Sequence, residues 1–416
     1  MPKTILVIGT LDTNTKELAH LRDRIEKEVV EVLLMDVSCK EVQTGATAEI
    51  PCSSVAQETG RDFTEVSQSD KITAVKLMRE GAITITNSLV EEGRVHGVMG
   101  LGGANGAEIG CAVMRTLPIG LPKLMVTCVA SGNTRPYVGA KDIVMFNSIG
   151  DVSLNSITKR VINNAARAIT HMATQESTEE AEAKPQICMS TFGTTLGCVD
   201  RAKALLEEKG FEVIELHASG SGGMALEELV KEGEASAVLD ITTSEIVDDL
   251  VGGMYSAGPH RLEAASEMGI PQVVSFGALD FGNFGAKETI PKEFQDRHFF
   301  FYAPSITLMR TNAEESRILG KRIAEKLNRS KGPAGVIVPL KGFSAVDSPG
   351  GKRKTRIDGS DAGEWYDEEA NGALIESVRK NLDASKVKLV EVDAHINDPE
   401  FADAAVALLL ELIKIK

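Results

Sequence analysis

The chain opens with a short run of apolar, mostly β-branched residues, KTILVIGT, which ends in Gly9 and Thr10. A stretch with apolar residues at helical spacing, Leu18, Leu21 and Ile25, follows, and a second apolar run, VVEVLLMDV, comes after it. Uninterrupted apolar runs are typical of parallel strands buried on both faces, whereas a period of 3.6 residues predicts a helix. The beginning of the chain therefore predicts a strand–helix–strand unit.

The same alternation continues through the first part of the chain. Strands are expected in VHGVMGLGG and PKLMVTCVASGN, and helices at 71–92, 104–117 and 151–172. The stretch 39–69 is polar and has no clear period.

An acidic segment of small residues, TQESTEEAEAKPQ at 174–186, contains Pro185 near its end. Such a composition is typical of a linker. The pattern then restarts with a strand in QICMSTFGTT, a helix closed by Gly210 and a strand in FEVIELHASGSGG. We therefore expect two domains, at residues 1–180 and 181–416.

The second domain continues with strands expected in ASAVLDITTSEIVDD, PQVVSFGALDFGNFG, FFFYAPSITLMR, GPAGVIVPLKGFSAVD and KVKLVEVDAHIND. Helices are expected at 312–328, 371–382 and 399–414. Strands that alternate with helices are typical of the α/β class. The predicted fold is two Rossmann-like domains with mostly parallel sheets and a cleft between them.

Glycine and small polar residues gather where the predicted strands end. In open α/β sheets ligands bind at the carboxyl ends of the strands, and glycine lets backbone N–H groups face a phosphate at a helix N-terminus. A glycine turn can also serve close packing alone, so each loop by itself is a weak signal. Several such loops in both domains predict a phosphate or nucleotide site, for which the candidate residues are Gly9, Thr10, Asp12, Thr13, Gly102, Gly103, Asn105, Gly106, Ser131, Gly132, Asn133, Gly193, Thr194, Thr195, Gly222 and Gly223.

These loops match neither established nucleotide fingerprint. The chain has no G-x-x-x-x-G-K-[ST] motif, and its glycines at 100–106 are one residue off the dinucleotide spacing. Asp36, at the end of the second strand, is a candidate for a ribose contact or a turn cap. Asp12 is a candidate Mg²⁺ ligand or a helix N-cap, and Lys16 is placed to reach a phosphate or lie in solvent.

Three residues of the second domain are candidates for catalysis. Asp240 ends a strand and is suited to Mg²⁺ binding, proton transfer or helix capping. Arg261 has the planar fork that grips carboxylates or phosphates. His395 lies between Asp393 and Asp398, which suggests an oriented general base, although Asp398 also fits a helix cap. No G-x-S-x-G motif supports serine hydrolase chemistry.

Composition argues against several classes of binding partner. The chain of 416 residues carries 45 basic and 60 acidic residues, a net charge of −15, which argues against nucleic acid or an anionic membrane as the main partner. Six scattered cysteines predict reduced thiols rather than a zinc site or disulfide framework. The chain has no apolar run of about 18 residues, so we expect no membrane span. The first strand is expected almost at the start of the chain, so we expect no signal peptide. We expect a cytoplasmic protein.

Eight short motifs occur together in a fixed order: GTLDT (9–13), GLGG (100–103), LPIGLPKLMV (117–126), ASGN (130–133), YVGAKDI (137–143), SAGPHRLEAA (256–265), GALD with NFG (277–285) and DAHIND (393–398). In these motifs, and over essentially its whole length, the chain resembles the UPF0261 family, also called the Tm-1-like ATP-binding domain family. The resemblance implies a two-domain α/β protein that binds ATP with Mg²⁺ and forms homodimers, and it points to the N-terminal domain for the nucleotide.

The resemblance leaves the activity open. One interpretation is an ATP-dependent enzyme that acts on a small carboxylate in the interdomain cleft; another is a non-catalytic nucleotide-binding module for regulation or protein interaction. A weaker one is a binder of sugar acids or phosphates without a nucleotide. The chain departs from the family pattern at Asn14-Thr15, where Lys-Gly is usual, and at Ala104-Asn105, where Ser-Gly is usual.

Overall fold

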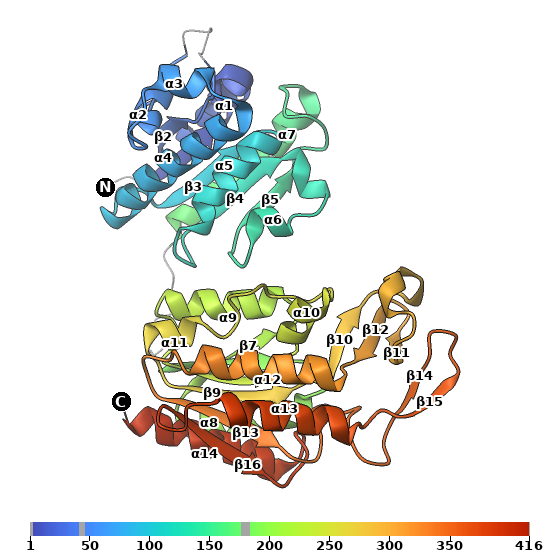
Figure 1. Cartoon of the computed structure of the whole chain (residues 1–416). Helices are drawn as coiled ribbons and strands as arrows, with labels where there is room; N and C mark the ends of the chain where they lie inside the picture. Colours follow the sequence, from blue (N-terminus) through green and yellow to red (C-terminus); the bar gives the residue numbers. More distant parts are fainter. Residues whose placement is uncertain (1–2, 41–45, 176–183, 416) are drawn as a thin grey trace. The chain divides into compact units, whose positions relative to one another are not determined.

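The computed structural model describes residues 3–40, 46–175 and 184–415, and the chain divides into two compact units, Met1–Glu180 and Ala181–Lys416 (Figure 1). Most of the segment expected to be the domain boundary, 176–183, lies outside the described residues. Strands and helices alternate in each unit, which confirms the α/β class.

The first unit is built on a five-stranded parallel sheet of order β2-β1-β3-β4-β5. The chain leaves β1 toward one edge of the sheet and later returns to the other side of β1, so the order reverses between β1 and β3. That switch point is where open α/β sheets bind ligands. The strands are β1 (Thr4–Gly9), β2 (Glu31–Asp36), β3 (Gly97–Leu101), β4 (Lys123–Thr127) and β5 (Val144–Asn147).

Helices cover both faces of this sheet. Ile5 and Val7 of β1 pack against α1 and α7, whereas Leu6 and Ile8 pack against α4 and α5. Every residue of β1 is therefore buried, which explains its uninterrupted apolar run. The helices are α1 (Leu11–Glu26), α2 (Cys52–Gln57), α3 (Phe63–Gln68), α4 (Lys71–Glu91), α5 (Ala104–Arg115), η1 (Cys128–Ser131), α6 (Arg135–Val138) and α7 (Ser156–Thr174).

The stretch 39–69, which shows no clear period in the sequence, contains two short helices. α2 and α3 are each six residues long, too short to show a helical period. Val55 and Val66 are fully buried in the same core as Met78 of α4. Packing against α4, rather than intrinsic propensity, holds these short helices.

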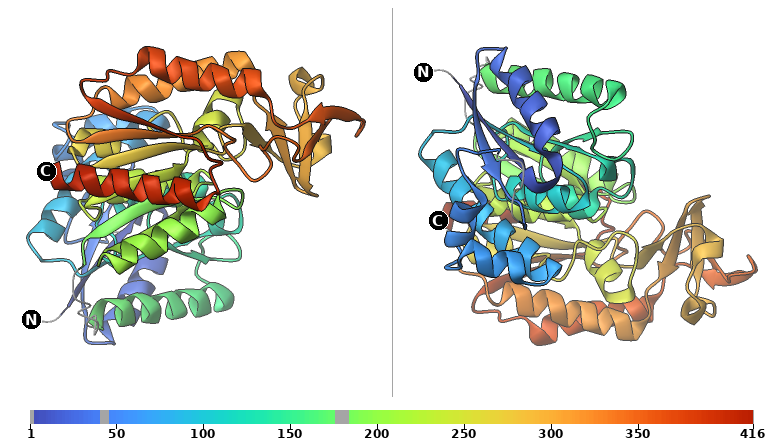
Figure 2. Two further views of the ribbon diagram at one scale, coloured as in Figure 1. Left: turned by 90° about the horizontal axis from the view of Figure 1, so that it is seen from below. Right: turned by 90° about the horizontal axis from the view of Figure 1, so that it is seen from above.

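The second unit has a six-stranded parallel sheet of order β16-β13-β9-β8-β6-β7, whose switch point lies between β6 and β8. α12 and α13 pack side by side along one face (Figure 2), and α8 and α14 pack on the other. The strands are β6 (Gln186–Thr191), β7 (Glu212–His217), β8 (Ala237–Thr242), β9 (Gln272–Gly277), β13 (Ala334–Pro339) and β16 (Val387–Val392). The helices are α8 (Leu196–Glu208), α9 (Ser221–Lys231), α10 (Glu245–Val251), α11 (Ala264–Met268), α12 (Ala313–Leu327), α13 (Glu368–Asn381) and α14 (Pro399–Ile415).

A second sheet, antiparallel and of order β10-β12-β11-β14-β15, extends beside the parallel one (Figure 1). The single strand expected in FFFYAPSITLMR is wrong, because the chain reverses at Pro304-Ser305 and its halves pair as β11 and β12. Proline fixes φ at a value suited to a turn, a signal hidden here between two apolar runs. The strands are β10 (Phe281–Phe284), β11 (Phe299–Ala303), β12 (Ile306–Arg310), β14 (Arg353–Thr355) and β15 (Asp361–Glu364), and two short 3₁₀ helices are η2 (Lys287–Thr289) and η3 (Lys292–Phe294).

Among the helices in the described ranges, none is both long and apolar enough to cross a membrane.

Candidate functional site

A polar cavity of about 520 Å³ lies in the first unit, where β1 and β3 end. Six of the residues predicted for a nucleotide site line it together: Thr10, Asp12, Thr13, Gly103, Asn105 and Gly106. The wall is completed by Asn14, Glu17, Cys39, Lys71, Ala104, Ile109, Asp151, Val152 and Ser153. The cavity is therefore at the switch point of the sheet, where the strand order predicts a ligand.

The first loop of the cavity has already used its backbone donors. The N–H of Leu11 donates to Asp36 Oδ1 at 3.0 Å, and the N–H of Asp12 donates to Ser38 Oγ at 3.0 Å. The N–H of Asn14 donates to the Thr10 carbonyl at 2.8 Å. This loop thus offers side chains rather than the N–H cradle that the sequence suggested.

Asp36 serves as the turn cap that the sequence allowed as an alternative. The carboxylate is 3% exposed, and its Oδ1 accepts the N–H groups of Leu11 and Ser38 and the Ser38 hydroxyl. It lines a separate hollow of about 510 Å³ with Pro51 and Phe63, and not the polar cavity. Its placement does not fit the ribose contact.

The second loop of the cavity, 102–106, still has backbone donors available. Gly103 caps α5 without any side-chain hydrogen bond, and α5 forms its first internal bond from the Ala107 N–H to the Gly103 carbonyl at 2.9 Å. The N–H groups of the three residues between them, 104–106, have no acceptor within the described parts of the chain. A Cβ on Gly102 would lie 3.1 Å from the Gly106 Cα, so glycine permits this close turn. Three backbone donors at a helix N-terminus thus remain available beside the cavity.

A third wall of the cavity, residues 151–153, is anchored to α1. The Asn14 side-chain amide donates to the Val152 carbonyl at 3.0 Å, and Glu17 accepts the Leu154 N–H at 2.6 Å. Asn14 is 6% exposed and has a non-helical φ of −121° inside α1. Sequence reasoning missed this wall, because these contacts join residues more than a hundred positions apart and no local motif announces them.

The cavity is acidic, with one lysine. Burial raises the pKa of the half-buried Asp12 carboxyl, and the nearby Asp36 adds to the rise. Asp12 Oδ1 is buried and has no hydrogen-bond partner among the described residues. Glu17 and Asp151 add negative charge, and Lys71, which the sequence did not single out, is the cation of the wall. The described residues include no cluster of three or more metal-ligating side chains.

The remaining candidates of this unit lie elsewhere. Leu18 fills the space that a Cβ on Gly9 would need, so this glycine serves packing. The loop after β4, Ser131, Gly132 and Asn133, is exposed and does not line the cavity. Lys16 is exposed and also lies outside the cavity wall.

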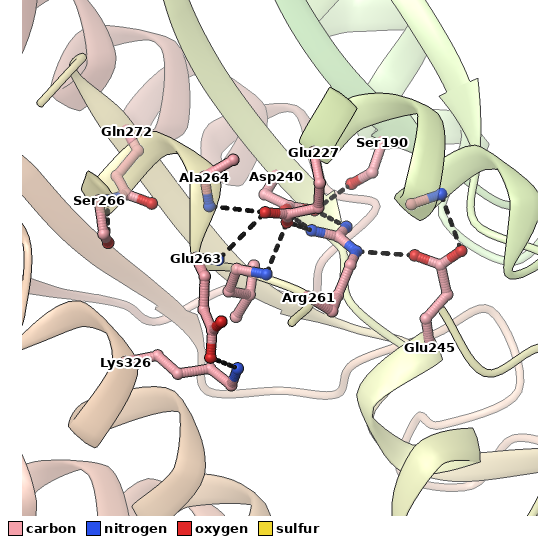
Figure 3. Close-up of polar contacts among 12 residues, drawn as sticks. Ser190, Glu227, Asp240, Glu245, Arg261, Glu263, Ala264, Ser266, Gln272 and Lys326 are labelled. Carbon is pink, nitrogen blue, oxygen red and sulfur yellow. Dashed lines mark hydrogen bonds and ion pairs between the residues drawn. The ribbon is translucent and has the colours of Figure 1, made fainter. Parts of the chain in front are cut away.

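In the second unit, Arg261 is the centre of a buried cluster of charges (Figure 3). Its guanidinium lies 2.5 Å from Asp240, 2.8 Å from Glu245 and 3.3 Å from Glu227, and it is 1% exposed. Asp240 also accepts the Ser190 hydroxyl at 2.6 Å. Because the carboxylates already occupy the fork of Arg261, neither it nor Asp240 fits the roles of anion clamp, metal ligand or catalyst that the sequence suggested.

One of these carboxylates, Glu245, organises the glycine loop at 220–223. Glu245 accepts the N–H groups of Gly220 at 2.6 Å and Gly223 at 2.9 Å, and burial raises its pKa. A protein carboxylate therefore lies where a phosphate was expected. A Cβ on Gly222 would lie 1.8 Å from the His217 carbonyl, and a Cβ on Gly223 would overlap Glu245. These glycines permit close packing of the chain.

His395 is held by the backbone on both sides of its ring. Nδ1 accepts the Asn397 N–H at 3.1 Å, so Nε2 carries the proton and donates to the Ser344 carbonyl at 2.9 Å. Asp398 accepts the His395 backbone N–H, and Asp393 pairs with Lys341 at 3.0 Å. Among the described residues no carboxylate hydrogen-bonds the ring, so its geometry does not fit the oriented general base.

The loop after β6 contributes to a different hollow. Thr195 Oγ1 bonds the Phe192 carbonyl at 3.1 Å and Thr242 Oγ1 at 2.7 Å. Gly193 and Thr194 line a pocket of about 210 Å³ whose other walls are mostly aromatic.

Both units of the chain are similar to known proteins. Residues 3–178 match the model described as "Uncharacterised protein family (UPF0261) N-terminal domain", and residues 184–413 match that of its C-terminal domain. A "UPF0261 protein" from Clostridium tetani is 40% identical over the full length of both chains. The "ToMV resistance protein Tm-1(GCR237)" of Solanum lycopersicum is 35% identical over 98% of this chain and 55% of its own length. Among solved structures, UDP-N-acetylglucosamine 2-epimerase from Rickettsia bellii is similar over 66% of this chain and 79% of its own, at 12% identity and a TM-score of 0.24.

Proposed function

The chain belongs to the UPF0261 family, and we propose that its first unit binds ATP together with Mg²⁺ in the polar cavity at the ends of β1 and β3. The observation that carries the proposal is the N-terminus of α5. Its three available N–H groups, at 104–106, lie beside a glycine turn at the switch point of the sheet. Helix N-termini of this kind bind phosphate groups in many α/β proteins.

The charges of the cavity support a metal-bound rather than a bare polyphosphate. Asp12, Glu17 and Asp151 would repel phosphates, and Lys71 offsets only part of that repulsion. Mg²⁺ is commonly bound by one or two carboxylates together with substrate phosphates, so it needs no all-protein cage. Asp12, whose buried Oδ1 has no partner in the described structure, is the residue that we assign to the metal. When bound, Mg²⁺ would neutralise the phosphates and the acidic wall.

We propose binding without an assigned catalytic step. Asp240 and Arg261 form an ion pair with each other, and both ring nitrogens of His395 are hydrogen-bonded to the backbone. These placements favour the nucleotide-binding regulatory or interaction module over an ATP-dependent enzyme acting on a small carboxylate. The family resemblance alone supports a homodimer, which light scattering of the purified chain would test.

Isothermal titration of ATP, with and without Mg²⁺, tests the proposal. We expect binding that requires Mg²⁺, that weakens severalfold in Lys71→Met and that Mg²⁺-tripolyphosphate competes away, because the phosphates make the contacts. Absence of binding at millimolar Mg²⁺-ATP would overturn the proposal. Binding that neither Lys71→Met nor tripolyphosphate affects would place the nucleotide elsewhere and overturn the site.

A further inference from the structure

Aromatic side chains are scarce in this chain, yet several gather at one pocket of the second unit. The chain has four tyrosines, seven histidines and one tryptophan. Tyr255, Tyr302, His217 and Phe192 all line the pocket of about 210 Å³. Phe192 follows β6 and His217 ends β7, so the pocket lies at the carboxyl end of the parallel sheet, where α/β folds bind ligands.

The rings of this pocket pack against one another, both face to face and edge to face. Phe192 and His217 stack with centroids 5.1 Å apart and planes 20° apart, and Tyr255 meets Phe192 edge-on at 6.1 Å. Tyr302 is 52% exposed, so part of its ring faces solvent beside the pocket. The walls thus offer both faces and edges for stacking against a further ring.

One buried polar atom in a residue of the pocket wall has no partner among the described residues. Thr194 is 3% exposed, and its Oγ1 is buried without a hydrogen bond among the described residues. The neighbouring Thr195, also buried, has two partners for its hydroxyl. A buried hydroxyl is usually paired, so this one leaves a donor in a residue of the pocket wall for a ligand atom or a water molecule.

Size and charge limit what this ligand can be. Asp, Glu, Lys and Arg are all absent from the described residues that line the pocket, so it offers a phosphate or carboxylate no countercharge. Pockets for drug-sized ligands are roughly 300–1,000 Å³, and this one is smaller. We propose that the pocket binds one uncharged, planar heteroaromatic ring of nucleobase size, which stacks on the aromatic wall and hydrogen-bonds Thr194 Oγ1 through its polar edge. The site stands on residues of the second unit alone and is independent of the ATP cavity.

Gly193 offers a way to close the pocket. A Cβ built there would lie 3.6 Å from Tyr302 Oη, an ordinary contact, and the backbone does not have the positive φ that requires glycine. Gly193→Leu therefore adds bulk to the pocket wall at a position whose backbone does not require glycine. Thr194→Val removes the unpaired hydroxyl at almost constant shape and breaks no hydrogen bond.

The probes are free adenine and free uracil. Their binding to the full chain is measured by ligand-observed saturation-transfer NMR. We expect at least one base to bind, with affinity reduced at least tenfold by Gly193→Leu and at least threefold by Thr194→Val. Cyclohexanecarboxamide, a non-planar ring with a polar edge, is expected not to bind. Gly103→Asp, which alters only the first unit, is expected to bind the base like the native chain.

The single tryptophan reports whether the variants fold. Trp365 is fully buried in a cluster against which Phe192 and Ile306 pack, so its emission follows the structure around the pocket. The proposal fails if neither base binds, or if cyclohexanecarboxamide binds as tightly. It also fails if Gly193→Leu keeps native tryptophan emission and native base affinity. Should Gly193→Leu not fold, unchanged affinity in Thr194→Val overturns the proposal instead.

Discussion

The side-chain amide of Asn14 donates to the carbonyl of Val152 at 3.0 Å, across 138 positions of sequence. Both residues line the polar cavity of the first unit, so this one bond fixes two of its walls relative to each other. Asn14 also accepts the hydroxyls of Thr10 and Thr13, at 3.2 and 3.1 Å. Asn14, one of the residues at which the chain departs from the pattern of the family it resembles, thus organises the first loop.

Asn14→Ala tests this organising role. The change leaves the buried Val152 carbonyl without its donor, which costs about 1–3 kcal/mol of stability. It also frees the wall 151–153, so the affinity for Mg²⁺-ATP should fall. Urea unfolding and titration calorimetry measure the two effects. Asn87→Ala, which loses an exposed bond to Thr116, is the matched control and should change stability by less than about 0.5 kcal/mol. Equal effects in the two variants would contradict the role of Asn14.

Arg261→Met tests the buried charge cluster of the second unit. The change leaves Asp240, Glu227 and Glu245 without their cation, and an uncompensated buried charge costs about 3–5 kcal/mol. Urea unfolding followed by the emission of Trp365, which belongs to the same unit, should show a large shift of the midpoint.

Arg201→Met is the control for that change. Arg201 pairs with Asp403 at 2.6 Å, but the two side chains are 44% and 46% exposed. Water screens such surface pairs, so they contribute little to stability. If the two arginine variants unfold at the same urea concentration, the cluster does not support the fold as described.

Asp248 should make the second unit less stable as the pH rises from about 4 to 7. Burial raises the pKa of its carboxyl to about 7, above its ordinary value of 3.8. The folded chain therefore holds a proton that the unfolded chain releases in this range, so the stabilisation is complete below about pH 4 and lost through pH 7.

Asp248→Asn should flatten this dependence. The amide keeps the acceptor for the Asn283 N–H, which Asp248 Oδ1 bonds at 2.6 Å, and it does not titrate. Some slope remains, because burial also raises the pKa values of Asp280 and Asp347. The measurement is the difference between the urea midpoints at pH 5 and pH 7.5. If this difference is the same in the variant as in the native chain, the assignment to Asp248 is refuted.

The sequence predicted the parallel sheets because their strands are buried on both faces. The uninterrupted run at Thr4–Gly9 and its glycine end located β1 and the first cavity loop. The same argument failed for FFFYAPSITLMR, since two antiparallel strands joined by a tight turn show the same apolar composition. Periodicity identifies an element, but it does not identify the partner of a strand.

The candidate site was predictable only in part. Strand-end loops brought Thr10, Asp12 and Gly103 together, since parallel strands end at one edge of the sheet. Glu245, however, accepts the N–H groups of the glycine loop at 220–223, and no residue near that loop in sequence predicts this contact. Whether glycine N–H groups face a ligand or a protein carboxylate depends on distant residues, which a local motif does not contain.

The N-cap of α5 allows the most direct test of nucleotide binding in the first unit. Gly103 has a φ of −69°, which any residue adopts, and both Asp and Asn are favoured at N-caps. Gly103→Asp and Gly103→Asn should therefore both fold, and they differ essentially in one negative charge placed beside the N–H groups of 104–106. That charge competes with a phosphate for the helix N-terminus.

The measurement is the calorimetric affinity of Mg²⁺-ATP for the native chain and these two variants. If the phosphates bind at α5, the Asp variant binds at least tenfold more weakly than the Asn variant, although both have native unfolding temperatures. If the Asp and Asn variants bind Mg²⁺-ATP with equal affinity, the nucleotide does not lie at the N-terminus of α5.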